Sequence, residues 1–423
     1  MQYRFEFRPY RRRFVRPLQT SHGNWDIREG IILRLTDENG QVGWGEIAPL
    51  SWFGSETLEQ ALSFCRQQPE EITADTIFSI PAALPACQFG FESAWEDISH
   101  FQDKANLTPL PPFPAREGGE LKAPFQPKKF IPFPSPCSYG VHTSLLELAS
   151  PVLIPPTPLK KGGNKVKVPL FKGDLGGSIN LLPLNKRCVY TVAPCRGGLG
   201  RGGEELGERF NESLTREYSY SGLLPAGEAA LSQWQTLWNQ GYRTFKWKIG
   251  VYPIADELKI FQLLTQTLPE GAKLRLDANG GLSYEQANLW LWTCDNVKAE
   301  ELPVEIEFLE QPLPVTQFQG MAELSMCYAT AIALDESVAT IDQMEAAYRE
   351  GWRGIFVIKP CIAGSPSRLR QFCQQHEIDA VFSSVFETAI GRQAALKLAA
   401  ELSRHNRAVG FGINHWFDED EEI

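Results

Sequence analysis

One short stretch, YRTFKWKIG at residues 242–250, indicates the fold of this chain. Apart from its basic residues the stretch is apolar and aromatic, and it follows Gly241 and ends at Gly250, as is typical of a buried strand. Lys246 and Lys248 are two positions apart, so on a strand their side chains point to the same face. Unpaired burial of two ammonium groups is costly, so we expect acidic partners or lowered pKa values.

From about residue 215, short apolar runs alternate with amphipathic stretches at a steady spacing. This rhythm is typical of repeated β-α units, and eight such units suggest a closed parallel barrel. An open doubly wound sheet is the alternative, but no Gly-x-Gly-x-x-Gly follows any run, so its dinucleotide-binding form lacks support. The expected strands are Ser219–Pro225, Thr244–Ile249, Lys273–Asp277, Ile306–Glu310, Ile332–Asp335, Gly354–Lys359, Ala380–Ser384 and Arg407–Phe411, with helices at Ala229–Asn239, Ala255–Thr267 and Tyr284–Thr293.

Polar residues lie at the ends of six successive expected strands. In a β/α barrel the carboxyl ends of the strands meet at one mouth, where active sites are built. These polar residues are therefore expected to form one site. They are Lys248, Asp277, Glu310, Asp335, Lys359 and the pair Ser383 and Ser384.

Three of these residues, Asp277, Glu310 and Asp335, are acids from adjacent expected strands. Crowded carboxylates repel and raise each other's pKa, and a hard divalent cation relieves this repulsion. Carboxylate oxygens suit Mg²⁺, whereas zinc prefers His or Cys ligands, and none joins this set. We therefore expect Mg²⁺ on these acids, with Glu336 as a rival to Asp335, and ion-paired or solvated acids as the alternative.

The lysines lie on either side of the expected metal site, since Lys246 and Lys248 come from the second strand and Lys359 from the sixth. This layout suits removal of a proton next to a carboxylate, which the cation holds while it stabilises the enediolate that develops. A lysine beside the cation and a second lysine has its pKa lowered and can act as the base. Salt bridges to the acids are the alternative.

Candidate substrate contacts at the same mouth are Asn279, Arg275, Ser383 and Ser384, each with a supporting or capping role as its alternative.

The remaining chain divides by composition. Residues 1–100 are expected to form an α+β domain, with strands at Gln2–Phe7, Gly30–Asp37 and Gln41–Ile47. Asn39-Gly40 is a hairpin signal between the second and third of these strands. A helix is expected to start near Thr57, which has Gln60 at the spacing of a capping box. Residues 101–212 are predicted to be a disordered insertion, because 16 Pro and 14 Gly at 101–210 give low-complexity character. The barrel is expected at 213–412, followed by an acidic tail at 413–423.

Bulk properties exclude several classes of partner. A net charge of −10 and a pI near 5.3 argue against nucleic acid and anionic membranes as main partners. No apolar run approaches the ~20 residues of a membrane-spanning helix. Nine cysteines without a Cys-x-x-Cys pair suggest reduced thiols and a cytoplasmic protein. A small-molecule carboxylate is the expected partner, and the oligomeric state is left open.

The same residues carry a family resemblance. The motifs KWK (246–248), LDAN (276–279), LEQP (309–312), LDES (334–337) and IKP (358–360) resemble those of the enolase superfamily. Within it the chain is similar to the o-succinylbenzoate synthase family over most of residues 1–100 and 215–412. GWGEIAP (43–49) resembles the end of that family's capping-domain sheet, and SSVFET (383–388) resembles its seventh-strand segment.

The resemblance implies an α+β capping domain over a (β/α)7β barrel, with Mg²⁺ on the three acids. It also implies a syn elimination of water from 2-succinyl-6-hydroxy-2,4-cyclohexadiene-1-carboxylate, in the pathway to menaquinone or phylloquinone. Lys248 would move the proton, Lys246 would lower the pKa of Lys248, and Lys359 would stabilise the enediolate. A loop at Thr20–Gly30 would close over the site.

Related activities are the alternatives. N-acylamino acid racemases and dipeptide epimerases of the superfamily use opposed lysines as two acid/base groups. Dipeptide epimerases usually carry Asp-x-Asp near the eighth strand, whereas this chain reads VGFGIN at 409–414. A non-catalytic barrel that binds a ligand is a more distant alternative.

Overall fold

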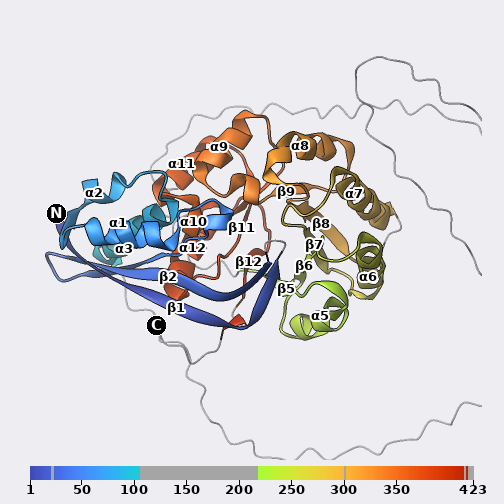
Figure 1. The fold of residues 1–423 in the computed structure, drawn as a ribbon, viewed down its shortest axis with the longest axis horizontal. Helices are drawn as coiled ribbons and strands as arrows, with labels where there is room; N and C mark the ends of the chain where they lie inside the picture. The colour runs from blue at the N-terminus through green and yellow to red at the C-terminus, as the bar shows by residue number, and fades with distance from the viewer. Residues whose placement is uncertain (21–22, 105–217, 300–301, 414–415, 418–423) are drawn as a thin grey trace, which may run out of the picture.

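The computed structural model describes residues 1–20, 23–104, 218–299, 302–413 and 416–417. These residues form a capping unit, blue in Figure 1, and a barrel coloured from green to red. Apart from the end of a helix at Lys104, the predicted insertion at 101–212 lies outside the described residues. So do all but three residues of the predicted tail at 413–423.

The cap is an antiparallel sheet with helices on one side. Its four described strands have the order β3-β2-β1-β4. The strands are β1 (Gln2–Thr20), β2 (Gly23–Asp37), β3 (Val42–Ile47) and β4 (Glu71–Thr73), and the helices are α1 (Leu58–Gln67), α2 (Ala74–Phe78) and α3 (Pro85–Lys104), with a 3-10 turn at Ser51–Phe53.

Two local signals in the cap are confirmed. The turn between β2 and β3 is stabilised by Asp37, whose Oδ1 accepts hydrogen bonds from the backbone N of Asn39 and of Gln41 at 2.9 and 2.8 Å. Helix α1 begins after Thr57, which exchanges capping-box hydrogen bonds with Gln60.

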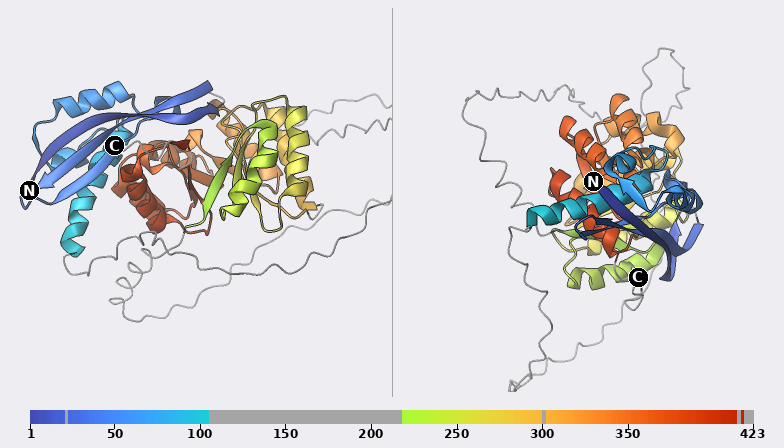
Figure 2. Two further views of the ribbon diagram at one scale, coloured as in Figure 1. Left: turned by 90° about the horizontal axis from the view of Figure 1, so that it is seen from below. Right: turned by 90° about the vertical axis from the view of Figure 1, so that its left-hand side faces the viewer.

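The loop conformation expected for Thr20–Gly30 is wrong, because most of this segment is a strand. From Gly23 onward the chain is strand β2, which pairs with β1 almost to the turn, and Leu18 lies opposite Trp25. Large apolar side chains on facing strand positions favour continued pairing over a loop. Figure 2 shows the resulting long hairpin as a ribbon that extends from the cap alongside the barrel.

The second unit is a closed parallel barrel, as expected, and the open doubly wound alternative is wrong. Its eight described strands have the order β11-β10-β9-β8-β7-β6-β5-β12, and a parallel bridge between Ser383 and Gly410 joins the two ends. The strands are β5 (Tyr220–Leu224), β6 (Thr244–Lys248), β7 (Lys273–Asp277), β8 (Glu305–Glu310), β9 (Ile332–Leu334), β10 (Ile355–Ile358), β11 (Asp379–Phe382) and β12 (Val409–Gly412).

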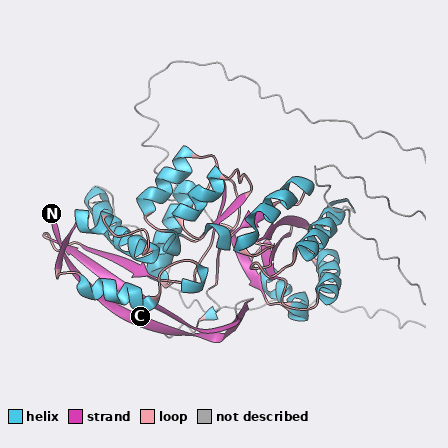
Figure 3. Ribbon diagram, turned by 45° about the horizontal axis from the view of Figure 1, so that its top comes forward, coloured by secondary structure: helices cyan, strands magenta, loops and turns pink. Residues whose placement is uncertain are grey.

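Helices surround the barrel, as Figure 3 shows. At least one helix follows each strand from β5 to β11 within the described residues, which is the (β/α)7β pattern. The helices are α5 (Ala230–Asn239), α6 (Ile254–Thr267), α7 (Tyr284–Ala299), α8 (Phe318–Cys327), α9 (Ile341–Arg349), α10 (Pro360–Ala363), α11 (Pro366–Gln375) and α12 (Ala389–Leu402), with 3-10 turns at Gly227–Ala229, Val315–Gln317 and Glu336–Val338.

Packing against these helices determines which strand residues point inward. On β6, Trp247 is fully buried and its ring lies 6.2 Å from that of Trp290 on α7. Because side chains alternate along a strand, Lys246 and Lys248 point to the opposite side, into the barrel. The apolar outer layer thereby places both lysines at the centre of the barrel.

The described residues contain no helix with the length and apolarity needed to span a bilayer.

Candidate active site

A cavity lies at the mouth of the barrel beneath the cap. Its volume is about 110 Å³, well above the ~10–15 Å³ that one water needs, so it has room for a small organic molecule. Cap and barrel both contribute to its wall. The lining residues are Leu18, Trp25, Leu50, Trp52 and Phe53 of the cap, and Ser221, Leu223, Lys246, Lys248, Asp277, Asn279, Asp335, Glu336, Lys359, Ser383, Ser384, Val385, Phe386, Gly410 and Ile413.

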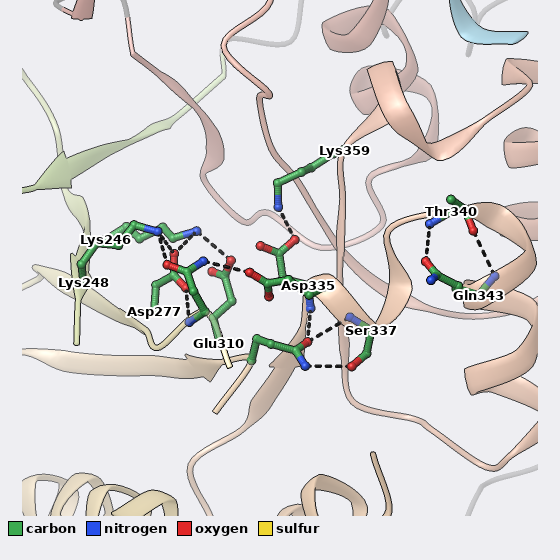
Figure 4. Close-up of polar contacts among 12 residues, drawn as sticks. Lys246, Lys248, Asp277, Glu310, Asp335, Ser337, Thr340, Gln343 and Lys359 are labelled. Atoms are coloured by element: carbon green, nitrogen blue, oxygen red, sulfur yellow. Dashed lines mark hydrogen bonds and ion pairs between the residues drawn. The ribbon is translucent and has the colours of Figure 1, made fainter. Parts of the chain in front are cut away.

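The paired lysines of β6 find an acidic partner on the next strand. Lys246 Nζ lies 2.8 Å and Lys248 Nζ 2.9 Å from the same oxygen, Oδ2 of Asp277, as Figure 4 shows. The strands are in register, since Lys248 lies beside Asp277 in the sheet. The expectation that the buried ammonium groups have acidic partners is confirmed.

Glu310, from β8, lies on the other side of Lys246. Lys246 Nζ is 2.7 Å from Glu310 Oε1, so its ammonium bridges Asp277 and Glu310. No group of three or more His, Cys, Asp or Glu side chains is arranged as a metal site within the described residues. The ammonium of Lys246 thus holds these two carboxylates close together.

Asp335 and Lys359 form the opposite wall. Lys359 Nζ forms an ion pair with Oδ1 of Asp335 and lies 4.1 Å from the ring centroid of Phe53 in the cap. This geometry combines an ion pair with a cation–π contact. Lys359 is therefore held between the barrel and the cap, across the cavity from Lys248 (Figure 4).

The carboxylates differ in proton affinity. Burial and then the charge of Asp277 raise the pKa of Glu310 to about 7. Burial also raises the pKa of Asp335 above its ordinary value, although Lys359 opposes the change. For Asp277, burial acts in the same direction, but Lys246 and Lys248 outweigh it and hold the pKa below its usual range. The expected mutual raising thus occurs at two of the three acids.

The acidic partners of Lys246 decide the direction in which its pKa shifts. Burial disfavours its charged form, but Asp277 and Glu310 outweigh burial and raise the pKa above its ordinary value. The carboxylate contacts within 3 Å are therefore stronger than the effect of burial.

The donor set fits Mg²⁺. Asp277, Glu310 and Asp335 supply hard oxygen donors from adjacent strands, and all three are buried. Among the described residues, Oε2 of Glu336 is buried without a hydrogen-bond partner, and Glu336 also lines the cavity. Both carboxylates of the Asp335–Glu336 pair therefore remain candidates.

Three of the four candidate substrate contacts line the cavity. Asn279 accepts a hydrogen bond from Lys248 and donates one of 3.0 Å to Glu336. Ser384 donates to Glu387 at 2.9 and 2.8 Å, so its hydroxyl supports the loop, whereas Ser383 bridges β11 and β12.

Arg275 is a correction, because it is absent from the cavity wall. It lies one inward position before Asp277 on β7, deeper in the barrel, and its Nε donates to Glu307 at 2.6 Å. Glu307 also binds Arg407 at 2.6 Å, and Arg407 binds Asp379. The same-face prediction was correct, but the face extends below the site, where Arg275 belongs to an ion-pair network.

Sequence reasoning missed Gln311, which positions the acid next to it in space. Its Oε1 accepts hydrogen bonds from the backbone N of Asp335 and of Ser337 at 3.0 and 3.2 Å, and its Nε2 donates to Ser337 Oγ. Gln311 has φ 37°, in the left-handed region, as does Asn279 with φ 45°. Such backbone strain clusters at functional sites. The signal in the sequence was its place directly after Glu310.

The aromatic wall from the cap was predicted only in part. The segment Thr20–Gly30 was expected to close over the site, and its Trp25 does line the cavity. Trp25 packs its ring 5.4 Å from that of Phe386, and 5.1 Å from that of Trp52. Leu18 and Phe53 complete this apolar side of the cavity. The sequence places Leu18, Trp52 and Phe53 far from the barrel motifs, so only the docked cap shows that they face these motifs.

Comparison with known proteins agrees with this geometry. A family model described as "Enolase C-terminal domain-like" matches residues 229–422, and one described as "MenC, N-terminal domain" matches residues 18–98. The o-succinylbenzoate synthase of Thermosynechococcus vestitus is 32% identical over 417 residues, which cover 98% of this chain and 93% of the relative. This chain belongs to the o-succinylbenzoate synthase family. It is a member of the enolase superfamily.

Solved structures support the same assignment. The crystal structure of the o-succinylbenzoate synthase from Thermosynechococcus elongatus BP-1, complexed with Mg in the active site, matches with a TM-score of 0.66 and 31% identity. The match covers 98% of this chain and 94% of that chain. The L-Ala-D/L-Glu epimerase of Bacillus subtilis matches with a TM-score of 0.59 at 17% identity, covering 99% and 91%. At that identity the second match shows a shared fold alone.

Proposed function

We propose that this protein is an o-succinylbenzoate synthase, a hydro-lyase that converts 2-succinyl-6-hydroxy-2,4-cyclohexadiene-1-carboxylate to 2-succinylbenzoate and water. The reaction belongs to menaquinone or phylloquinone biosynthesis. The observation that carries the proposal is the arrangement of Lys248 and Lys359 on opposite walls of one cavity, with three acids between them. Membership of the family over nearly the whole chain supports it.

Asp277, Glu310 and Asp335 are proposed to hold Mg²⁺, with Glu336 as the rival to Asp335. When bound, Mg²⁺ would hold the substrate carboxylate and stabilise the negative charge that develops on it. The ammonium of Lys246 contacts both Asp277 and Glu310, so it reduces their repulsion and keeps these two carboxylates close together.

Lys248 is proposed to transfer the proton. As the neutral amine, it takes the proton from the carbon next to the substrate carboxylate, and the C–H electron pair passes onto the carboxylate, which gives the enediolate. The electron pair then returns to form the ring double bond and the C–O bond to the hydroxyl group breaks, so that the group leaves as water with the proton that Lys248 returns on the same face. Asn279 and Asp277 both contact Lys248 Nζ and orient it toward the cavity. Loss of water makes the ring aromatic, which favours the forward direction.

Lys359 is proposed to stabilise the enediolate from the opposite side as an ammonium. Its Nζ lies between Asp335 and the ring of Phe53, so its position is determined by both the barrel and the cap. The apolar side of the cavity, built by Leu18, Trp25 and Phe386, would accommodate the ring and exclude water from the reacting carbon.

A racemase or epimerase activity is the second candidate. Lys248 and Lys359 on opposite walls would allow proton removal on one face and return on the other, as N-acylamino acid racemases and dipeptide epimerases require. Residues 409–413 at the end of β12 contain no acid that would hold a peptide amine, which argues against the epimerase.

The deciding experiment assays purified protein with the cyclohexadiene carboxylate, with Mg²⁺ and with EDTA, and in parallel with an N-acylamino acid. We expect dehydration that depends on Mg²⁺ and is much faster than racemisation. Racemisation without dehydration would favour the second candidate. Absence of both activities would point to the non-catalytic binding barrel.

A further inference from the structure

The buried carboxylate of Glu46 connects the cap to the loop after β11. Glu46 lies near the end of β3 and is fully buried. It accepts hydrogen bonds from the backbone N of Thr388 at 3.0 and 2.9 Å, from the Thr388 hydroxyl at 2.5 Å and from Gly391 N at 3.0 Å. Thr388 is the N-cap of α12, so a cap carboxylate satisfies the free N–H groups at the start of a barrel helix.

Two glycines, Gly391 and Gly30, leave room for the contacts that Glu46 makes with α12 and with Tyr10. A Cβ at Gly391 would lie 2.7 Å from Oε2 of Glu46, which is closer than atoms approach. Tyr10, on β1, donates to Oε1 of Glu46 at 2.5 Å, although β2 lies between their strands. A Cβ at Gly30 on β2 would lie 2.6 Å from the Tyr10 side chain, so only glycine lets Tyr10 reach across. Glu46 therefore joins three elements, which are β1 of the hairpin, its own strand β3 and α12.

The loop that ends at Thr388 forms part of the cavity wall. Ser383, Ser384, Val385 and Phe386 line the cavity. Within the loop, Glu387 accepts hydrogen bonds from the Ser384 hydroxyl and from Val385 N at 2.7 Å. Phe386 adopts φ 63°, a strained conformation for a residue other than glycine.

Phe386 is also the loop residue that packs against the β1–β2 hairpin. The ring of Phe386 lies 5.2 Å from that of Phe14 and 5.4 Å from that of Trp25, both on the β1–β2 hairpin. Loop and hairpin thus form the apolar wall together. Their relative position depends on Glu46, which binds both Tyr10 of the hairpin and Thr388 at the end of the loop.

We propose that Glu46 is a positioning residue for the reaction, which fixes the loop at 383–388 against the β1–β2 hairpin so that the substrate pocket exists only with the cap docked. Glu46 is not among the residues that line the cavity, so it acts through the loop. The expected effect on the kinetics rests on the proposed function.

Glu92 offers a matched control at the same interface. It lies on α3, is buried, and accepts hydrogen bonds of 2.5 Å from the Ser365 hydroxyl and from Ser367 N at the start of α11. It therefore also joins the cap to a barrel helix through a carboxylate. None of the residues 364–367 lines the cavity, so loss of this contact affects docking of the cap without touching the substrate wall.

The test compares wild type, Glu46→Gln and Glu92→Gln by steady-state kinetics and by hydrogen exchange of peptides covering 383–388. We expect Glu46→Gln to raise KM about tenfold, with kcat changed less than about threefold, and to speed exchange in the loop. Glu92→Gln should leave both near wild type while lowering the melting temperature to a similar extent. Tyr10→Phe, which keeps the helix-capping contacts, should raise KM by a smaller factor of about three.

Equal changes in KM and in loop exchange for Glu46→Gln and Glu92→Gln would overturn the proposal, because Glu46 would then only hold the cap. Should Glu46→Gln not fold, an unchanged KM and loop exchange in Tyr10→Phe would overturn it. A wild-type protein that does not dehydrate the substrate would contradict the proposed function, whereas the exchange comparison still tests Glu46 independently.

Discussion

The ammonium of Lys246, on β6, lies 2.7 Å from the carboxylate of Glu310, on β8, and so reaches across the intervening strand. Closure of the barrel brings inward-facing side chains of neighbouring strands together, which allows this contact. The same ammonium lies 2.8 Å from Asp277. One lysine thus bridges two carboxylates that are proposed to bind Mg²⁺.

Replacing Lys246 by Met should destabilise the metal-free protein by about 1–3 kcal/mol, because Asp277 and Glu310 both lose a hydrogen-bond donor within 3 Å. Glu310, whose pKa is already raised to about 7, should then take up a proton. Mg²⁺ should then raise the melting temperature of the variant more than that of wild type. Thermal unfolding with EDTA and with Mg²⁺ measures both effects. Lys273→Met is the control, because Lys273 pairs with Glu305 at 3.2 Å in solvent and should cost less than about 1 kcal/mol. Equal stability of metal-free Lys246→Met and wild type would show that the bridge contributes nothing.

Replacing Lys248 by Ala should reduce kcat by at least about 10²–10⁴-fold, the range that a positioned general acid–base group contributes. The fold should survive, because the change leaves Asp277 paired with Lys246. Steady-state turnover measures the loss, and circular dichroism with a titration of 2-succinylbenzoate controls for folding and binding. Substantial turnover in a folded variant would remove Lys248 from the proton-transfer role.

Replacing Glu307 by Gln should cost about 3–5 kcal/mol at pH 7, because Arg275 and Arg407 both lose a buried partner within 2.6 Å. Chemical denaturation gives the difference. Glu305→Gln on the same strand is the control, since Glu305 is exposed and pairs with Lys273 at the surface. A loss for Glu305→Gln as large as that for Glu307→Gln would contradict the assignment of a buried network.

The Glu307 network should also make stability depend on pH. Burial opposes ionisation, but Arg275 and Arg407 outweigh it and lower the pKa of Glu307 from 4.5. The unfolded chain then binds more protons near this pH, so the contribution is fully present above pH 4.5 and is lost as the pH falls through the lower folded value. The stability difference between wild type and Glu307→Gln should therefore shrink below pH 4.5. A difference that stays constant down to pH 3 would show that the pKa is not lowered.

Replacing residues 105–217 by a Gly/Ser linker should leave a folded, active enzyme. The described cap and barrel contact each other directly, through Glu46 with Thr388 and through Glu96 with Arg370, so their docking does not require the segment between Lys104 and Tyr218. Melting temperature and turnover of the deletion variant, compared with wild type, measure the effect. Unfolding of the variant would show that the segment belongs to the fold.

Strand positions in the barrel were predictable because burial on both faces leaves a strong local signal. The run Lys273–Asp277 is a strand with those limits, and Thr244–Ile249 is one residue longer than β6. The polar strand ends were predictable for the same reason, since each interrupts an apolar run. Lys248, Asp277, Asp335 and Lys359 do meet at one cavity, as the barrel geometry requires.

Contacts between distant segments were beyond local patterns. The partner of Arg275 is Glu307, which lies 32 residues further along the chain. Periodicity indicates that Arg275 and Asp277 share a face of the strand, but it does not indicate how deep in the barrel each side chain lies. The rise in the pKa of Lys246 likewise depends on distances below 3 Å to two other strands. The long β1–β2 hairpin was mistaken for a loop because its apolar residues are buried by the barrel mouth and the C-terminal segment.

By itself, the sequence determined the barrel and the order of its strands along the chain, because short apolar runs alternate with amphipathic stretches. It also determined the set of lysines and acids at the strand ends, because each of these residues interrupts an apolar run. Only the tertiary structure decided how the site is enclosed. The cap brings Trp25 and Phe53 over the barrel, and Glu46 connects it to Thr388, 342 residues away. Such contacts depend on how two separately patterned units dock, and this information is not present in either segment alone.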